Sequence, residues 1–127
     1  MRLPRVRRPP LREVGQDPDY RFSLANERTF LAWIRTSLAL LAAGVAVIQI
    51  IPSFGPPGGR LALGVVLIVL ALILAAASYP RWEGVERAMR LGRSLPESVV
   101  SRVVAYGLGA VAVLSLILIV LDAGTGR

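Results

Sequence analysis

The sequence contains neither cysteine nor histidine among its 127 residues. Disulfide bonds are therefore excluded, as are thiolate and imidazole ligands for a metal ion. The same absences remove the usual pairs of nucleophile and base. We accordingly expect no catalytic residue, no metal, no cofactor and no enzymatic activity.

Charged side chains are also missing from three long stretches, residues 37–51, 61–79 and 103–121. The second and third have 19 residues each, about 28 Å of helix, which nearly spans a hydrocarbon core of ~30 Å. Hydrophobic residues make up 54% of the chain, and a chain of this size cannot surround three helices that are apolar on every face. The sequence therefore predicts an all-α membrane protein with three transmembrane helices.

Lysine is absent as well, so all 15 basic residues are arginine, which we attribute to a GC-rich genome. Eight precede the first stretch and five lie between the second and third, whereas Arg60 and Arg127 are the two others. Because basic segments stay in the cytoplasm, we expect the N-terminus and second loop inside and the first loop and C-terminus outside.

The chain divides into three parts. The first is a basic arm without hydrophobic periodicity, which we expect to be disordered and to contact anionic lipid head groups. Its position beside a membrane span favours lipid over nucleic acid as a partner. The predicted limits are 1–16 for this cytoplasmic arm, 17–122 for a membrane domain with spans at about 32–51, 61–79 and 101–121, and 123–127 for an external tail.

Helix ends are indicated by proline and by capping residues. Asp17 is the expected N-cap of the first helix, with Pro18 at the first helical position. This helix either runs unbroken to the end of the span or bends near Ser23, with its first part on the membrane surface. Pro52 and Pro80 are expected to end the first two helices.

The segment between spans two and three, RWEGVERAMRLGR, has apolar residues at spacings of three and four, namely Trp82, Val85 and Met89. This pattern predicts a short interfacial helix with its tryptophan at head-group depth. The following Ser94-Leu95-Pro96-Glu97 predicts a capping box that opens the third helix. The remaining acidic residues after span one, Glu83, Glu86 and Asp122, are placed in loops or at span ends.

An arginine residue enters the first span. The uncharged block 37–51 gives only about 22 Å of helix, so Arg35 is expected at the inner edge of the hydrocarbon. Spacings of three and four place it on one helix face that carries only arginine, alanine and glutamine. This arginine–alanine face comprises Arg21, Ala25, Arg28, Ala32, Arg35, Ala39, Ala42, Ala46 and Gln49.

Two interpretations of this face are open. It is either a packing seam whose arginines snorkel to water, or the wall of a cationic vestibule that leads to a narrow, alanine-lined constriction. Three helices cannot enclose a pore, so a conduit requires several copies, each contributing one helix. Glu27 lies beside the face and is expected either to pair with Arg28 or Arg35, in its own or a neighbouring copy, or to be solvated.

The segment Arg21-x-x-Leu24-Ala25-x-Glu27-Arg28-Thr29-x-Leu31-Ala32-Trp33-x-Arg35-Thr36 resembles the signature of the YidH-like family of small bacterial inner-membrane proteins. With the order of the spans, the resemblance covers residues 17–121. It implies a multi-pass protein of the bacterial inner (plasma) membrane.

The same domain resembles the membrane part of the eukaryotic vacuolar transporter chaperone complex, which makes polyphosphate and passes it through the membrane. There, three-helix domains form a pentameric ring whose first-helix basic residues face the conduit. The resemblance implies this role for Arg28 and Arg35, with Glu27 as their pairing partner. The chain departs from that complex in lacking its polymerase and phosphate-sensing domains.

Together these patterns predict a homo-oligomer, pentameric by the resemblance, that conducts anions such as phosphate or polyphosphate. The alternative is a non-transporting scaffold or accessory subunit whose arginine–alanine face binds lipid head groups or a partner helix. In the conduit, Arg28 and Arg35 would line the cytoplasmic mouth, and Arg21 would lie further out. Ala39, Ala42 and Ala46 would form the narrow wall. Gln49 would form the outer polar ring.

Overall fold

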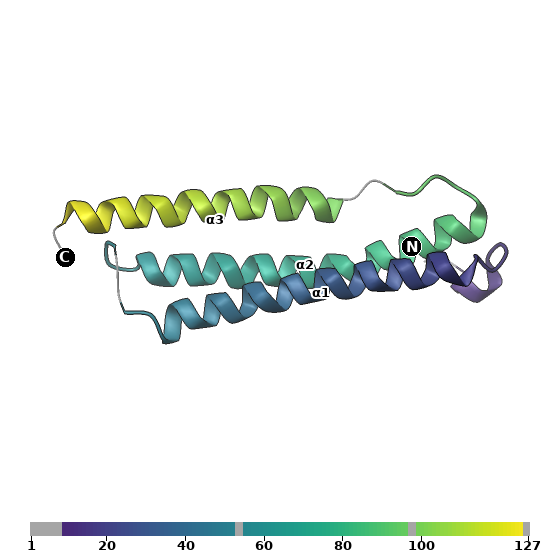
Figure 1. Ribbon diagram of the computed structural model, residues 1–127, viewed down its shortest axis with the longest axis horizontal. Helices are drawn as coiled ribbons and strands as arrows, with labels where there is room; N and C mark the ends of the chain where they lie inside the picture. The colour runs from purple at the N-terminus through teal and green to yellow at the C-terminus, as the bar shows by residue number, and fades with distance from the viewer. Residues whose placement is uncertain (1–8, 53–54, 97–98, 126–127) are drawn as a thin grey trace, which may run out of the picture.

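The computed structural model describes residues 9–52, 55–96 and 99–125. Its elements are a short 3₁₀ turn, η1 (Leu11–Glu13), and the helices α1 (Tyr20–Gln49), α2 (Gly59–Leu91) and α3 (Val99–Gly124). The helices lie along a common long axis, with α2 between α1 and α3 (Figure 1). All three are long and apolar enough to cross a membrane, which confirms the predicted all-helical, three-helix architecture.

The first helix is continuous, so the expected alternative of a bend near Ser23 does not occur. Its N-cap is Asp19, whose Oδ1 accepts a hydrogen bond from the Arg21 N–H at 3.0 Å. The prediction of Asp17 as the cap was wrong, because α1 begins only at Tyr20; the Asp17 carboxylate lies 3.1 Å from the Arg90 guanidinium. The α1 helix ends at Gln49, two residues before the predicted end of span one.

The second helix does not end at Pro80, as the sequence predicted, but runs on to Leu91. Proline removes one backbone hydrogen bond and costs about 3 kcal/mol inside a helix. Burial of the residues beyond it, including Val85 and Ala88, offsets that cost. The segment predicted as a separate interfacial helix is therefore the last part of α2.

The α1 and α2 helices pack closely where glycines face each other. A Cβ at Gly44 would lie 2.9 Å from the carbonyl oxygen of Gly64, so the two backbones touch. Nearby, the Ser37 hydroxyl donates to the carbonyl oxygen of Ala71 at 2.6 Å. Both features are typical of helix pairs in membranes, where small residues and short polar contacts replace hydrophobic association.

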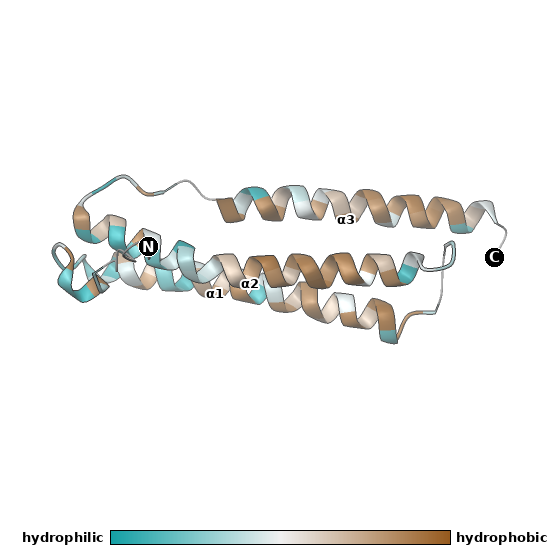
Figure 2. Ribbon diagram, turned by 180° about the vertical axis from the view of Figure 1, so that it is seen from behind, coloured by the Kyte–Doolittle hydropathy of each residue, from teal (hydrophilic) through white to brown (hydrophobic). Residues whose placement is uncertain are grey.

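Among the described helices, α3 packs against α2, and it exposes most of its surface. Its buried residues are Val100 and Leu118, and Gly107 lies directly against the Leu70 side chain. At its C-terminal end, Asp122 Oδ1 accepts a hydrogen bond from the Gly55 N–H at 2.9 Å. Most of α3 is hydrophobic (Figure 2), and its exposed apolar residues suit contact with lipid.

Polar residues gather at one end of the molecule, where η1 meets the last turns of α2 (Figure 2). There the Gln16 N–H donates to the carbonyl oxygen of Arg90 at 3.1 Å, and Arg87 donates to the carbonyl oxygen of Pro9 at 3.2 Å. Part of the segment expected to be a disordered arm is thus placed against α2. Residues 1–8 of that arm, and Glu97 of the predicted capping box, lie outside the described residues.

Candidate functional site

The arginine–alanine face of α1 points away from α2. The residues through which α1 is buried are Asn26, Ser37, Leu40 and Gly44, and at about 100° per residue they lie roughly opposite this face. Every member of the face is exposed except Ala46, which is half-buried. The packing of this chain therefore leaves the whole face free.

The arginines of this face, Arg21, Arg28 and Arg35, are spaced by seven residues, or about 10 Å along the helix axis. Among the described residues none of them forms an ion pair. Glu27 is exposed and likewise pairs with no arginine of the described chain. Its expected pairing with an arginine of a neighbouring copy stays a prediction.

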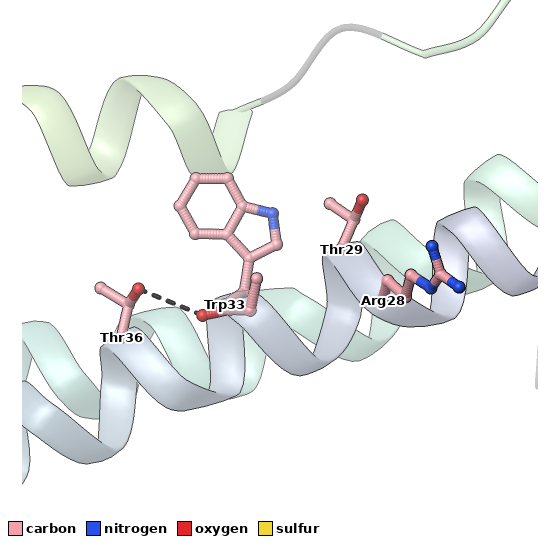
Figure 3. Close-up of a pocket in the computed structure, with 5 residues that line it drawn as sticks. Arg28, Thr29, Trp33 and Thr36 are labelled. Atoms are coloured by element: carbon pink, nitrogen blue, oxygen red, sulfur yellow. Dashed lines mark hydrogen bonds between the residues drawn. The ribbon is translucent and has the colours of Figure 1, made fainter.

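A cavity of about 330 Å³ lies between the arginine–alanine face and the buried side of α1 (Figure 3). Its lining combines a guanidinium, an indole and two hydroxyl groups, and no carboxylate. The indole of Trp33 stands off the helix toward α3, and its Nε1 is buried without a hydrogen-bond acceptor among the described residues. The lining residues are Arg28, Thr29, Ala32, Trp33 and Thr36.

The cavity is lined by several hydrogen-bond donors. The threonine hydroxyls bond back to helix carbonyls at 3.1 Å and the Trp33 Nε1–H is buried, so the donor left for a ligand is the Arg28 guanidinium. Donors without nearby carboxylates suit a ligand that supplies oxygen acceptors. The sequence argument missed Trp33 as a site residue, and its place in the signature segment was the one available signal.

A polar cluster fixes the N-terminal half of α1 on α2. Glu86, 7% exposed, accepts hydrogen bonds from the Ser23 hydroxyl at 3.1 Å and from Asn26 Nδ2 at 3.2 Å. Asn26 Nδ2 also donates to the carbonyl oxygen of Trp82 at 3.1 Å. Of the two expected positions for Glu86, a loop is excluded because α2 continues through it to Leu91, and Glu86 lies beyond the uncharged stretch 61–79. The cluster sets the rotation of α1 and so the direction of the arginine–alanine face.

Comparison with known proteins places this architecture in a family. A domain of unknown function, DUF202, matches residues 21–88, which include the arginine–alanine face and most of α2. An uncharacterized protein of Mycobacterium tuberculosis is 50% identical over 110 residues, which cover 87% of this chain and 90% of the relative. The inner membrane protein YidH of Escherichia coli is 48% identical over 101 residues, which cover 80% of this chain and 88% of YidH.

No solved structure matches the chain. Neither the family description nor the names of these relatives indicate an enzyme. The agreement with YidH extends over most of both chains, and the three apolar helices account for a location in the membrane. The chain thus belongs to the DUF202 family and is a YidH-like protein of the bacterial inner membrane.

Proposed function

We propose that the protein forms an oligomeric conduit for anions, with phosphate and polyphosphate as the substrate class. Arg28 and Arg35 would attract the anion at a cytoplasmic mouth, and Arg21 would contribute further out. The observation that carries this proposal is the arginine–alanine face of α1, which the packing of the chain leaves exposed along its length.

The position of Arg35 is the main physical argument. In lipid, an arginine at the edge of the hydrocarbon costs a few kcal/mol unless it reaches water or a partner. No acidic partner is present within the described residues. Copies arranged with their α1 faces toward a shared, water-filled axis would remove the cost. A ring of guanidinium groups would then focus the field and favour anions.

The layering of the helices fits such a ring. The α1 helix carries the polar free face, α2 lies in the middle, and α3 exposes apolar residues such as Leu116, Ile119 and Val120. With α1 inward and α3 toward lipid, each surface meets a suitable environment. Ala39, Ala42 and Ala46 would form the narrow wall and Gln49 the outer polar ring.

Anion flux into proteoliposomes tests the proposal. We expect Arg35→Glu to abolish or reverse the preference for anions, because the ring would change sign, whereas Arg35→Lys should retain it. Arg93→Glu is the matched control, since Arg93 is exposed but lies outside the arginine–alanine face. Unchanged selectivity in Arg35→Glu would remove Arg35 from the mechanism.

The exposed alanines of α1 also favour the second candidate, a scaffold or accessory subunit, because small residues let a partner helix approach closely. Native mass spectrometry from nanodiscs separates the two. A ring-sized species, five copies by the family resemblance, makes a central conduit geometrically feasible. A monomer or dimer leaves too few helices to surround a pore and favours the scaffold.

A further inference from the structure

A second cavity lies at the polar end of the molecule, between α1, α2 and the segment that follows α2. Its volume is about 270 Å³. Its walls are mainly apolar, and the charged group among them is the guanidinium of Arg81. The lining residues are Phe22, Ala25, Asn26, Thr29, Arg81, Val85, Met89, Leu95 and Pro96.

Arg81 differs from the arginines of the α1 face. It is half-buried, and its Nη1 is enclosed without a hydrogen-bond partner among the described residues. It also forms no ion pair with a described carboxylate. A partly desolvated guanidinium without an acceptor is unfavourable. An anion in the cavity would stabilise Arg81, and no described residue provides one.

Both acidic groups of α2 are already engaged. Glu86 accepts hydrogen bonds from Ser23 and Asn26, and Glu83 pairs with Arg87 at 3.4 Å. Neither carboxylate lines the cavity. Among the described residues, no carboxylate is therefore placed to neutralise Arg81.

The cavity lies at the level where an apolar span ends. Arg81 is separated from the uncharged stretch 61–79 by Pro80 alone, and the rings of the flanking residues Tyr79 and Trp82 lie 5.8 Å apart. Tyrosine and tryptophan gather at head-group depth in membranes. Apolar walls formed by Phe22 and Leu95 next to a guanidinium match an amphiphile with a phosphate head.

We propose that this cavity binds a phosphate-bearing ligand through Arg81, with the phosphate of a membrane phospholipid as the expected source. The site is separate from the arginine–alanine face and does not depend on ion conduction. Arg81 supplies a planar fork of donors for phosphate oxygens, and the apolar walls accept the beginning of an acyl chain.

Native mass spectrometry of the purified full chain, stripped of lipid in detergent, tests the site. One arm adds phosphatidylglycerol and the other adds inorganic pyrophosphate without lipid. We expect one lipid per chain to remain bound to the wild type, and Arg81→Gln to weaken binding by about tenfold, in line with a lost charge-assisted contact. Arg93→Gln, which changes an exposed arginine of the adjacent segment, should bind as the wild type does.

A second variant tests the site even if Arg81→Gln does not fold. Leu95 is 64% exposed, so Leu95→Asp should fold normally while placing a carboxylate at the cavity to occupy Arg81 and repel phosphate. Arg81-dependent binding of pyrophosphate alone would support the phosphate site but assign it to a soluble ligand. Equal binding of both probes by the wild type, Arg81→Gln and Leu95→Asp would overturn the proposal.

Discussion

Ser23, Asn26 and Glu86 form a cluster of polar side chains between α1 and α2, in which Asn26 and Glu86 are buried and Ser23 is half-buried. In such surroundings a hydrogen bond is worth little net, but a buried group left without its partner is costly. Asn26 is 6% exposed and satisfies both Glu86 and the carbonyl oxygen of Trp82. The cluster therefore acts on the orientation of α1 more than on the total stability of the protein.

We expect Asn26→Leu to lower the free energy of unfolding by about 1–3 kcal/mol, because Glu86 Oε1 loses its donor. Thermal unfolding in detergent, followed by fluorescence of the two tryptophans, measures the change. The double variant Asn26→Leu with Glu86→Leu should recover much of the loss, since no buried charge is then left unpaired. Glu27→Gln, which changes an exposed residue, should alter the free energy of unfolding by less than about 0.5 kcal/mol. A loss as large as that of Asn26→Leu would show that the effect does not come from the bond between Asn26 and Glu86.

At the residue scale the sequence predicted the arginine–alanine face, because spacings of three and four residues place side chains on one face of a single helix. No contact with another helix is needed for that inference. It did not predict the roles of Trp33, Arg81 or Glu86. The environments of Arg81 and Glu86 are made by contacts between residues about sixty positions apart, as in the bond between Asn26 and Glu86. Such contacts follow from helix packing and leave no local pattern.

Among the elements, the closest approach is that of α1 to α2 at Gly44 and Gly64. We expect Gly44→Ala to destabilise the protein by about 1–3 kcal/mol, because its Cβ would lie 2.7 Å from Ile68 Cγ1 and 2.9 Å from the Gly64 carbonyl oxygen. Gly109→Ala is the matched control, because Gly109 has no atom within 4 Å of the added Cβ. It should be neutral or stabilise by roughly 0.5–1 kcal/mol through helix propensity. Equal melting temperatures for the two variants would argue against the glycine contact.

The helices were predicted in number and place because long uncharged runs leave few alternatives. Their ends were harder to predict. Pro80 favours a helix end locally, yet packing of residues 81–91 on α1 keeps α2 intact. Asp17 has the chemistry of an N-cap, but α1 begins only at Tyr20, so Asp19 is the cap. At Pro80 a contact distant in sequence outweighs the local preference.

The polar end of the molecule, with η1 and the end of α2, lies opposite the end where α2 begins and α3 ends (Figures 1 and 2). An odd number of crossing helices puts the two chain ends on opposite sides of the membrane. Copy number and contacts between copies leave no signature in one chain's composition. The assembly therefore had to be proposed from the surface that packing leaves free.

The direction of insertion decides which compartment the arginine–alanine face serves, and it is testable because the chain has no cysteine. We introduce single cysteines at Pro57 and Ser94, which are exposed at opposite ends of α2. The excess of arginine around Ser94 predicts that a membrane-impermeant maleimide will label Pro57→Cys in intact cells, and Ser94→Cys only after permeabilisation. The reverse pattern would turn the Arg28 end outward and rule out a cytoplasmic mouth. Labelling of both sites in intact cells would indicate two orientations, and opposed copies could not form one ring of arginines.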